Sequence, residues 1–167
     1  MLDHFKRFAR YNAWANQRLY SACSVLPRDT YLQPRPSFFG SLHRTLNHIL
    51  VGDRIWMGRF VGVPSGISAL DQVLYPELDS LRAARDDEDV RIRAYIDSLD
   101  EPTLAAPLAY ATMAGVAFED PLAALLAHLF NHQTHHRGQA HGLLSEAGAT
   151  PPPLDLLYFM RDEARTT

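Results

Sequence analysis

Apolar residues recur at helical spacing in four long stretches of the chain. Placed at about 100° per residue on a helical wheel, the apolar positions of each stretch gather on one face. Prolines, glycines and capping residues mark the ends of the stretches. The pattern predicts amphipathic helices over about 2–26, from 37 or 41 to 61, over 77–99 and over 121–147.

Start and end signals support these helices. Ser37 or Ser41 can cap the start of the second helix, since a serine hydroxyl accepts a hydrogen bond from a free backbone N–H. In the fourth helix, Asp120 is the expected N-cap, Pro121 the first helical residue and Gly148 the terminating residue. The fourth helix therefore carries the clearest boundaries.

The connecting segments complete the expected fold. Residues 62–76 hold glycines and prolines and predict a loop, whereas 108–118 predict either two short extended pieces or a plain loop. A short amphipathic helix is expected over 154–163. The sequence predicts an all-α protein, a four-helix bundle with a short C-terminal helix, in one domain over 1–167.

Composition narrows the class of protein. Of the 167 residues, 47% are hydrophobic and 21% are charged, which is typical of a globular chain. The formal net charge of -3 lacks the basic excess that nucleic-acid binding needs, and no apolar run is long enough to span a membrane. A single cysteine, Cys23, fits a reducing compartment. We expect a soluble, cytoplasmic protein that acts on a small molecule and binds neither nucleic acid nor membrane.

Histidines are concentrated in the fourth helix, where five of the eight in the chain fall within 128–141. His132 and His136 lie one turn apart on the buried face, so both imidazoles can reach one metal ion. The alternative is a pair of hydrogen-bonded core histidines. Because each buried imidazole needs partners for two ring nitrogens, the pair favours metal.

A third ligand is expected from the second helix. His48 lies on the flank of its apolar stripe, whereas His43 lies further round, on the solvent side, so the wheel weakly favours His48. Gly52 and Gly138 have no side chain and leave space on their helices beside the histidines. Either another group approaches the backbone closely at these positions or the helices simply pack tightly.

Further polar residues fall on buried faces. Asn12 lies at the centre of the first helix's apolar face, either satisfied by backbone or positioning another group. Arg85 and Glu88 point inward from the third helix, either as an internal ion pair or as an anchor for an acidic substrate and a general base. Residues expected to support the ligands or contact a substrate are Asn12, Asn16, Arg85, Glu88, His128 and Gln139.

An outward aromatic side chain bears on assembly. Trp14 points away from the apolar face of its helix, and the tail at 156–159 is apolar. Together they predict either a homodimer interface or a cap that closes the end of the bundle.

Three motifs resemble those of the DinB/YfiT-like metalloprotein family. They are YNAWAN at 11–16, TLNHIL at 45–50 followed by Asp53 and Trp56, and NHQTHHRGQ at 131–139. The resemblance implies a four-helix bundle whose metal is held by His48, His132 and His136. It also implies a bacterial, DNA-damage-inducible protein of the stress response, within a superfamily that includes enzymes using low-molecular-weight thiols.

Such a centre would have a defined chemistry. Three neutral imidazoles leave the charge of a divalent ion uncompensated and a coordination position open, so the pKa of a water or a thiol would fall there. Zinc or nickel is the expected ion, and iron and copper also suit imidazole. Gln133 stands where an H-E-x-x-H protease has glutamate, and no catalytic base is assigned. The function expected is metal-dependent hydrolysis or small-thiol transfer; the alternative is a metal-binding stress protein or sensor without turnover.

Overall fold

The structure, a computed structural model, describes residues 1–166 and confirms the mostly helical fold. Its elements are α1 (Leu2–Cys23), α2 (Arg28–Leu32), α3 (Leu42–Val61), α4 (Leu78–Asp97), α5 (Glu101–Ala105), β1 (Pro107–Ala111), β2 (Ala117–Pro121), α6 (Leu122–Glu146) and α7 (Leu156–Thr166). The four long helices are those that the apolar pattern predicts. The short helices α2 and α5 were not predicted.

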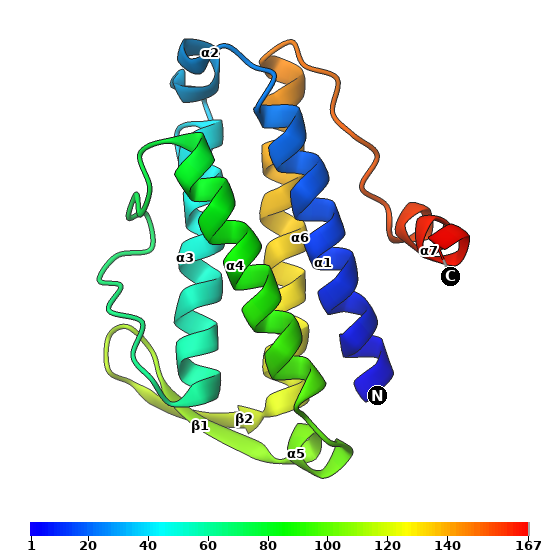
Figure 1. Ribbon diagram of the computed structural model, residues 1–167. Helices are drawn as coiled ribbons and strands as arrows, with labels where there is room; N and C mark the ends of the chain where they lie inside the picture. Colours follow the sequence, from blue (N-terminus) through cyan, green and yellow to red (C-terminus); the bar gives the residue numbers. More distant parts are fainter. Residues whose placement is uncertain (167) are drawn as a thin grey trace.

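Helices α1, α3, α4 and α6 form the bundle (Figure 1). Helix α1 packs beside α4 and α6, and α3 packs beside α6 and α4. The loop 62–77 returns along the length of the bundle, so α3 and α4 run in the same direction (Figure 1). Leucine-rich clusters fill the interior at both ends of the bundle. The candidate site is built on the neighbouring pair α3 and α6.

Most of the predicted helix ends are confirmed. The Ser41 hydroxyl accepts a hydrogen bond from the backbone N–H of Arg44 at 3.1 Å, and Gly148 follows α6 with a positive φ of 80°. The predicted N-cap Asp120 is wrong, because Asp120 pairs with Leu108 in a β-hairpin. Strand β2 therefore includes Pro121, and α6 begins one residue later than predicted.

The hairpin settles the reading of the segment before α6. Strands β1 and β2 are antiparallel, with Pro107 opposite Pro121 and Ala111 opposite Ala117. This confirms the two extended pieces and excludes the plain loop. The hairpin lies across one end of the bundle beside α5, and its turn reaches toward the loop 62–77 (Figure 1).

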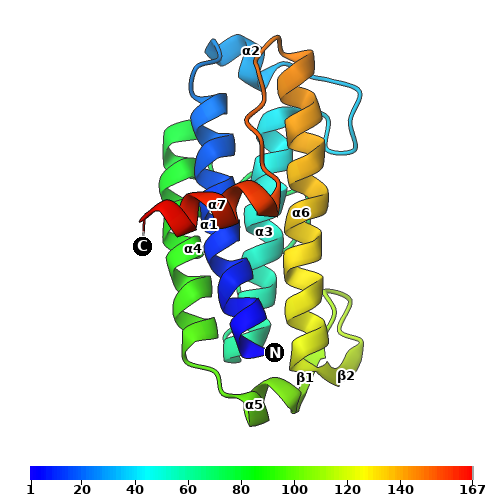
Figure 2. The same cartoon turned by 90° about the vertical axis from the view of Figure 1, so that its right-hand side faces the viewer.

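The C-terminal helix α7 crosses the outer side of α1 (Figure 2). Phe159 is buried there, with its ring centroid 5.9 Å from that of Tyr11 and 5.8 Å from that of Trp14. The Trp14 indole N–H donates a hydrogen bond to Asp162 at 3.2 Å. The chain's own tail thus covers the outward tryptophan.

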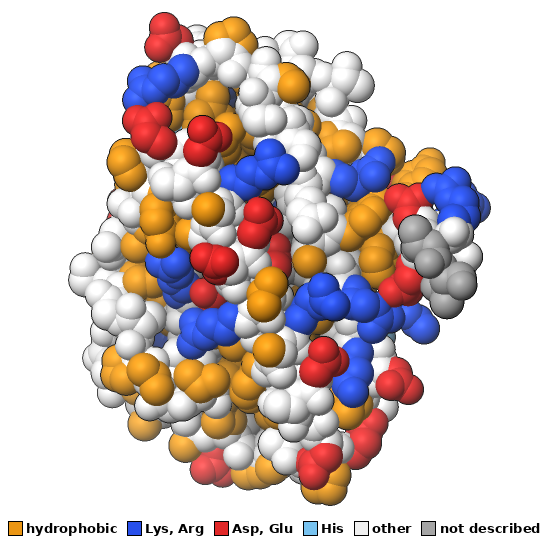
Figure 3. Space-filling model, viewed as in Figure 1, with side chains coloured by type: hydrophobic (Ala, Val, Ile, Leu, Met, Phe, Trp, Pro, Cys, Tyr) orange, Lys and Arg blue, Asp and Glu red, His pale blue; other side chains and the backbone are white. Residues whose placement is uncertain are grey.

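The visible face of α1 and α4 mixes side chains of both charges with apolar ones (Figure 3). Within residues 1–166, no helix combines the length and the hydropathy that a membrane span requires.

Candidate metal centre

Three histidines meet between α3 and α6. The Nε2 atom of His48 lies 3.1 Å from Nε2 of His132 and 3.2 Å from Nε2 of His136. One nitrogen from each ring lies within 4.8 Å of the other two, and this cluster could hold a metal ion. The i, i+4 spacing on α6 supplies two of the rings side by side, and α3 supplies the third.

Two of the rings are held by their other nitrogen. Nδ1 of His48 lies 2.8 Å from the Leu70 carbonyl oxygen, which can only accept, so this Nδ1 carries the proton. Nδ1 of His136 lies 2.8 Å from Oε1 of Gln139 and donates in the same way. Both Nε2 atoms therefore present lone pairs toward one another. Metal-binding histidines are held by this kind of outer hydrogen bond, so the residues fit a metal ion.

Burial keeps the three imidazoles neutral. His48 and His136 are buried, and burial lowers the pKa of each. Burial, together with the neighbouring imidazoles, lowers the pKa of His132 to about 3. The Nδ1 atom of His132 is buried without a hydrogen-bond partner. Three neutral rings with converging lone pairs would gain the missing electrostatic partner from a cation.

A glycine makes room for one of these rings. A Cβ atom at Gly52 would lie 2.6 Å from Cε1 of His132, so α3 and His132 approach as closely as they do only because residue 52 has no side chain. The close approach predicted at Gly52 is confirmed. At Gly138 it is wrong, because nothing lies within 4 Å of the position where a Cβ would stand.

An aromatic side chain that sequence reasoning missed covers one side of the cluster. Phe39 stacks on His48 with ring centroids 3.9 Å apart, and its edge meets His136 at 5.4 Å. It lies in the loop before α3, where no helical period applies. Its only signal in the sequence is a large apolar residue close before a candidate ligand.

A cavity of about 430 Å³ opens on the cluster. His48 and His132 line it, and the helices α3 and α6, the loop residue Leu70 and the turn between β1 and β2 form its walls. None of its lining residues is acidic. A small molecule in this cavity would lie directly against the two imidazoles.

Comparison with known proteins agrees with this arrangement. A model of the DinB family matches residues 1–166. The chain belongs to the DinB family. It is 30% identical to Protein DinB of Bacillus subtilis, with 96% of each chain aligned. The fold is similar to the crystal structure of a DinB-like protein from Bacillus cereus, with a TM-score of 0.63 and 19% identity over 83% of this chain and 89% of that one.

In this DinB family member, two of the other predicted residues lie beside the histidines. Gln139 holds His136 through its side-chain oxygen, as described above. His128 lies one turn before His132 on α6, with ring centroids 6.0 Å apart, and lines the same cavity.

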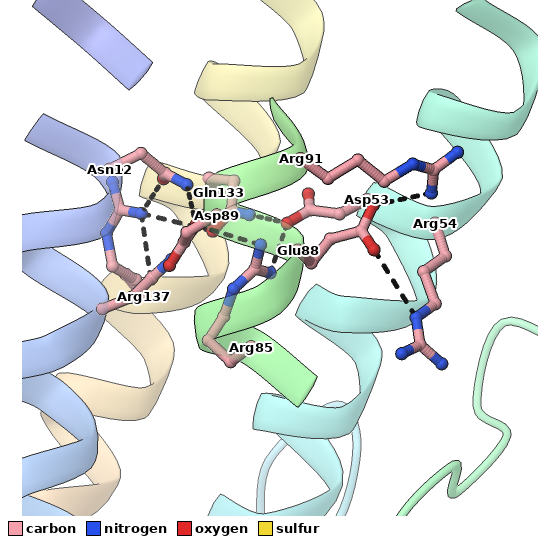
Figure 4. A network of polar contacts seen from close by, with 10 residues as sticks. Asn12, Asp53, Arg54, Arg85, Glu88, Asp89, Arg91, Gln133 and Arg137 are labelled. Atoms are coloured by element: carbon pink, nitrogen blue, oxygen red, sulfur yellow. Dashed lines mark hydrogen bonds and ion pairs between the residues drawn. The ribbon is translucent and has the colours of Figure 1, made fainter. Parts of the chain in front are cut away.

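The remaining predicted residues lie in a separate polar network (Figure 4). Asn12 and Asn16 of α1 donate hydrogen bonds to Asp89 at 3.1 Å, and Arg85 pairs with Asp89 at 3.0 Å and with Asp53. These are side-chain contacts, so the alternative in which backbone satisfies Asn12 is not what the structure shows. Arg85 and Glu88 are both ion-paired, as one alternative had it, but not with each other: the partners of Arg85 are Asp53 and Asp89.

Helix α6 completes the network. Arg137 donates to Asn12 and, at 3.3 Å, to Asn16, while Gln133 donates to Asp53. All of these side chains are almost fully buried. Burial raises the pKa of Asp53 to about 7, against the opposing effect of Arg85.

Glu88 lies at the edge of this network, with its carboxylate 3.0 Å from Arg91 and 3.7 Å from Arg54 (Figure 4). It does not line the cavity at the histidines.

One placement from the helical wheel is wrong. His43 is buried, not on the solvent side, because Tyr31 of the unpredicted helix α2 covers it. Nδ1 of His43 lies 2.8 Å from the Tyr31 hydroxyl, and Nε2 lies 3.2 Å from the Asn47 amide. Both nitrogens have partners in the protein, so His43 is engaged apart from the three-histidine cluster.

Proposed function

We propose that the protein is a metal-dependent enzyme that joins a small thiol to an electrophilic small molecule. The observation that carries the proposal is the convergence of three Nε2 atoms, from His48, His132 and His136, beside a cavity that the first two of these histidines line. The three residues would bind a divalent ion, zinc or nickel in the first place, with iron or copper as further options for imidazole donors.

When bound, such an ion supplies positive charge that lowers the pKa of a thiol or a water at its open position. The imidazoles, two of them held by Leu70 and Gln139, would hold the ion beside the cavity that His48 and His132 line. Phe39 covers the other side of His48. The thiol loses its proton to solvent, and its sulfur forms a bond to carbon. The electrons of the broken bond leave with a halide or, in an epoxide, go to the ring oxygen, which takes a proton from solvent.

Thiol transfer is favoured over hydrolysis by the ordinary acidities of the two nucleophiles. A thiol has a pKa of about 8.5 and free water one of about 15.7, so the same positive charge yields the thiolate more readily than hydroxide. The cavity lining includes no carboxylate to act as a general base for water, and its histidine outside the three-histidine cluster is His128. Glu88, the carboxylate considered from the sequence, is paired with Arg54 and Arg91 instead.

The experiment begins with protein purified without a histidine tag and loaded with zinc or nickel. A panel of small thiols is mixed with halogenated and epoxide electrophiles, with metal-loaded and metal-free protein, and conjugates are measured by mass spectrometry. We expect conjugates only with metal. Metal bound without any turnover would favour the alternative, a metal-binding stress protein or sensor, and hydrolysed electrophile in place of conjugate would favour hydrolysis.

Matched histidine variants test the ligands. We expect His136→Ala to weaken metal binding by more than about 100-fold, beyond the range known for outer-shell partners, with an unchanged helical circular dichroism spectrum. His141→Ala is the control, because His141 lies on the same helix and bonds the Pro152 carbonyl outside the cluster. Equal metal content in the two variants would contradict the proposal.

A further inference from the structure

The wall of the cavity beyond the histidines carries one positive charge. Arg59 of α3 lines it together with Trp56, and both face the turn between β1 and β2, which contributes Met113. No acidic side chain shares this lining. A cavity that joins a cation to apolar surface has the character of a site for an amphipathic anion.

The Arg59 guanidinium is held in place by aromatic rings. Its Cζ atom lies 4.4 Å from the centroid of the Trp56 ring and 5.4 Å from that of Tyr110. A cation held over aromatic faces is attracted by the rings without spending its N–H donors on them. The two rings therefore position Arg59 and leave its hydrogen-bonding capacity for another partner.

Arg59 also differs from Arg54 and Arg85 in its partners. Unlike the buried Arg137, which donates to amide oxygens, it lines the cavity at the histidines. Arg54, on the same helix, contacts Glu88 at 3.7 Å and the Tyr75 hydroxyl at 3.0 Å, and Arg85 pairs with two aspartates. Within residues 1–166 the structure gives Arg59 no ion pair with a carboxylate. A half-buried guanidinium without an opposite charge in the protein can form an ion pair with a bound anion.

The planar shape of the Arg59 guanidinium indicates that the anionic group of the ligand is a carboxylate. A single planar guanidinium matches one carboxylate through two parallel hydrogen bonds, whereas a phosphate is commonly held by several cationic and backbone donors. The remaining wall is apolar, with Ile55, Trp56 and Met113 beside the arginine. A ligand that satisfies both parts has a carboxylate at one end and an apolar or aromatic body.

We infer that the cavity binds small apolar carboxylic acids, with the carboxylate on Arg59 and the apolar body against Trp56 and Met113. Such a ligand fills the space between Arg59 and the pair His48 and His132. The inference deepens the proposed function, on which its catalytic meaning rests, because it gives the electrophilic substrate a carboxylate. The binding itself requires only this chain's own side chains.

Binding can be measured without metal and without turnover. The chain has two tryptophans, and Trp14 meets Phe159 of α7 edge to face, away from the cavity, so in a Trp14→Phe background the tryptophan fluorescence reports Trp56 alone. Metal-free protein is titrated with hydrocinnamate and with hydrocinnamamide, its neutral amide of nearly equal shape. We expect the acid to bind about ten-fold more tightly, because a charged hydrogen-bonded pair is stronger than a neutral one.

Variants assign this preference to one residue. We expect Arg59→Gln to bring the affinities for acid and amide to about the same value, and Arg59→Lys to retain part of the preference. Arg54→Gln is the matched control and should keep the full preference, since Arg54 does not line the cavity. Circular dichroism checks that each variant is folded.

Several results would overturn the inference: equal affinities for acid and amide in the parent protein, no binding of either, or a preference that survives Arg59→Gln. If Arg59→Gln does not fold, added salt replaces it as the test. Salt should weaken the acid alone, and equal weakening of acid and amide counts against the inference. If the acid is not preferred over the amide, the effect of His136→Ala on metal binding is unaffected. If His136→Ala does not weaken metal binding, the preference for the acid can still hold. The two proposals are therefore tested independently.

Discussion

Helices α3 and α6 contribute to two polar clusters through side chains that are neighbours in sequence, and α1 and α4 supply the rest of the second cluster. One side of the pair carries the histidines, and the other side carries the buried network of charges and amides. Three pairs of consecutive residues divide between the two sides: Gly52 and Asp53, His132 and Gln133, His136 and Arg137. The same two helices thus hold both clusters in fixed relation.

The clusters differ in what their groups can offer one another. In the network, the carboxylates of Asp53 and Asp89 face the guanidinium groups of Arg85 and Arg137, and amides bridge them. Opposite charges lie beside one another, and most donors and acceptors have partners within the protein; one oxygen of Asp53 and two nitrogens of Arg85 are buried without a hydrogen bond. The three histidines instead bring three similar groups together, because their neutral Nε2 atoms lie close to one another. The first arrangement sets each charge beside an opposite one, whereas the second presents three neutral donors that could hold a metal ion.

The largest effect is expected from breaking the network. Arg85→Met would leave Asp53 and Asp89 buried without their cation, so we expect a loss of about 3–5 kcal/mol in the free energy of unfolding. Urea denaturation of the metal-free protein measures this loss. Arg82→Met is the control on the same helix, because Arg82 bonds only the Ser21 hydroxyl near the surface. A loss below about 1 kcal/mol for Arg85→Met would mean that the network does not stabilise the fold.

The next effect concerns the room between α3 and His132. Gly52→Ala would place a methyl group 2.6 Å from Cε1 of His132 and displace the ring. We expect metal affinity to fall by about 100-fold, the upper range for changes that misorient a ligand. Gly138→Ala is the control on α6, where the added methyl meets nothing within 4 Å and should stabilise the helix by about 1 kcal/mol. Competition with a chelator gives both affinities, and equal values would contradict the steric argument.

A smaller effect is expected at the support of His136. Gln139→Ala removes the oxygen that accepts the proton of Nδ1 at 2.8 Å, so the ring loses its fixed orientation. We expect metal affinity to fall about ten-fold, with the free energy of unfolding of the metal-free protein nearly unchanged. Gln139→Glu retains an acceptor and should keep the affinity of the parent. The same loss in both variants would show that the hydrogen bond is not what matters.

The smallest effect is a dependence on pH in the metal-free protein. The folded state holds the pKa of His132 near 3, below the unfolded value of about 6.5, so the folded state binds fewer protons. The stability from the neutral ring is complete above about pH 6.5 and is lost progressively as the pH falls toward 3. When the pH falls from about 7 to about 5.5, we expect the free energy of unfolding of His132→Asn to decrease by about 1 kcal/mol less than that of the parent protein. Parallel pH profiles in thermal denaturation would contradict this expectation.

The two clusters also differ in how much of each could be predicted from the sequence. The i, i+4 spacing of His132 and His136 is local to one helix and predicts their shared direction. Predicting the third histidine requires knowing how two helices lie against each other. The helical wheel favoured His48 only weakly, and the family resemblance was needed to choose it. For Asn12 and Arg85 the wheel predicted burial but not the partners that lie on other helices, Asp89 for Asn12 and Asp53 for Arg85; the pairing of Arg85 with Asp89 is instead local to α4, at i, i+4.

Errors arose where an unpredicted short element changed the surroundings. His43 was assigned to solvent because α2, a helix of 5 residues, gives little periodic signal. Asp120 was assigned to a helix cap because its sequence suits a cap equally well, and only pairing with Leu108 makes it part of a strand. Arg59 and Met113 come together only through the folding of the hairpin against the bundle.

The hairpin turn at 112–114 forms part of the cavity wall, yet the four long helices do not depend on it for their packing. Substitutions or insertions there would remodel the entrance while leaving the imidazoles and the charged interior intact. Evolution could thereby retune ligand choice through a few exposed positions, and the same three-residue tip offers a compact target for engineered libraries.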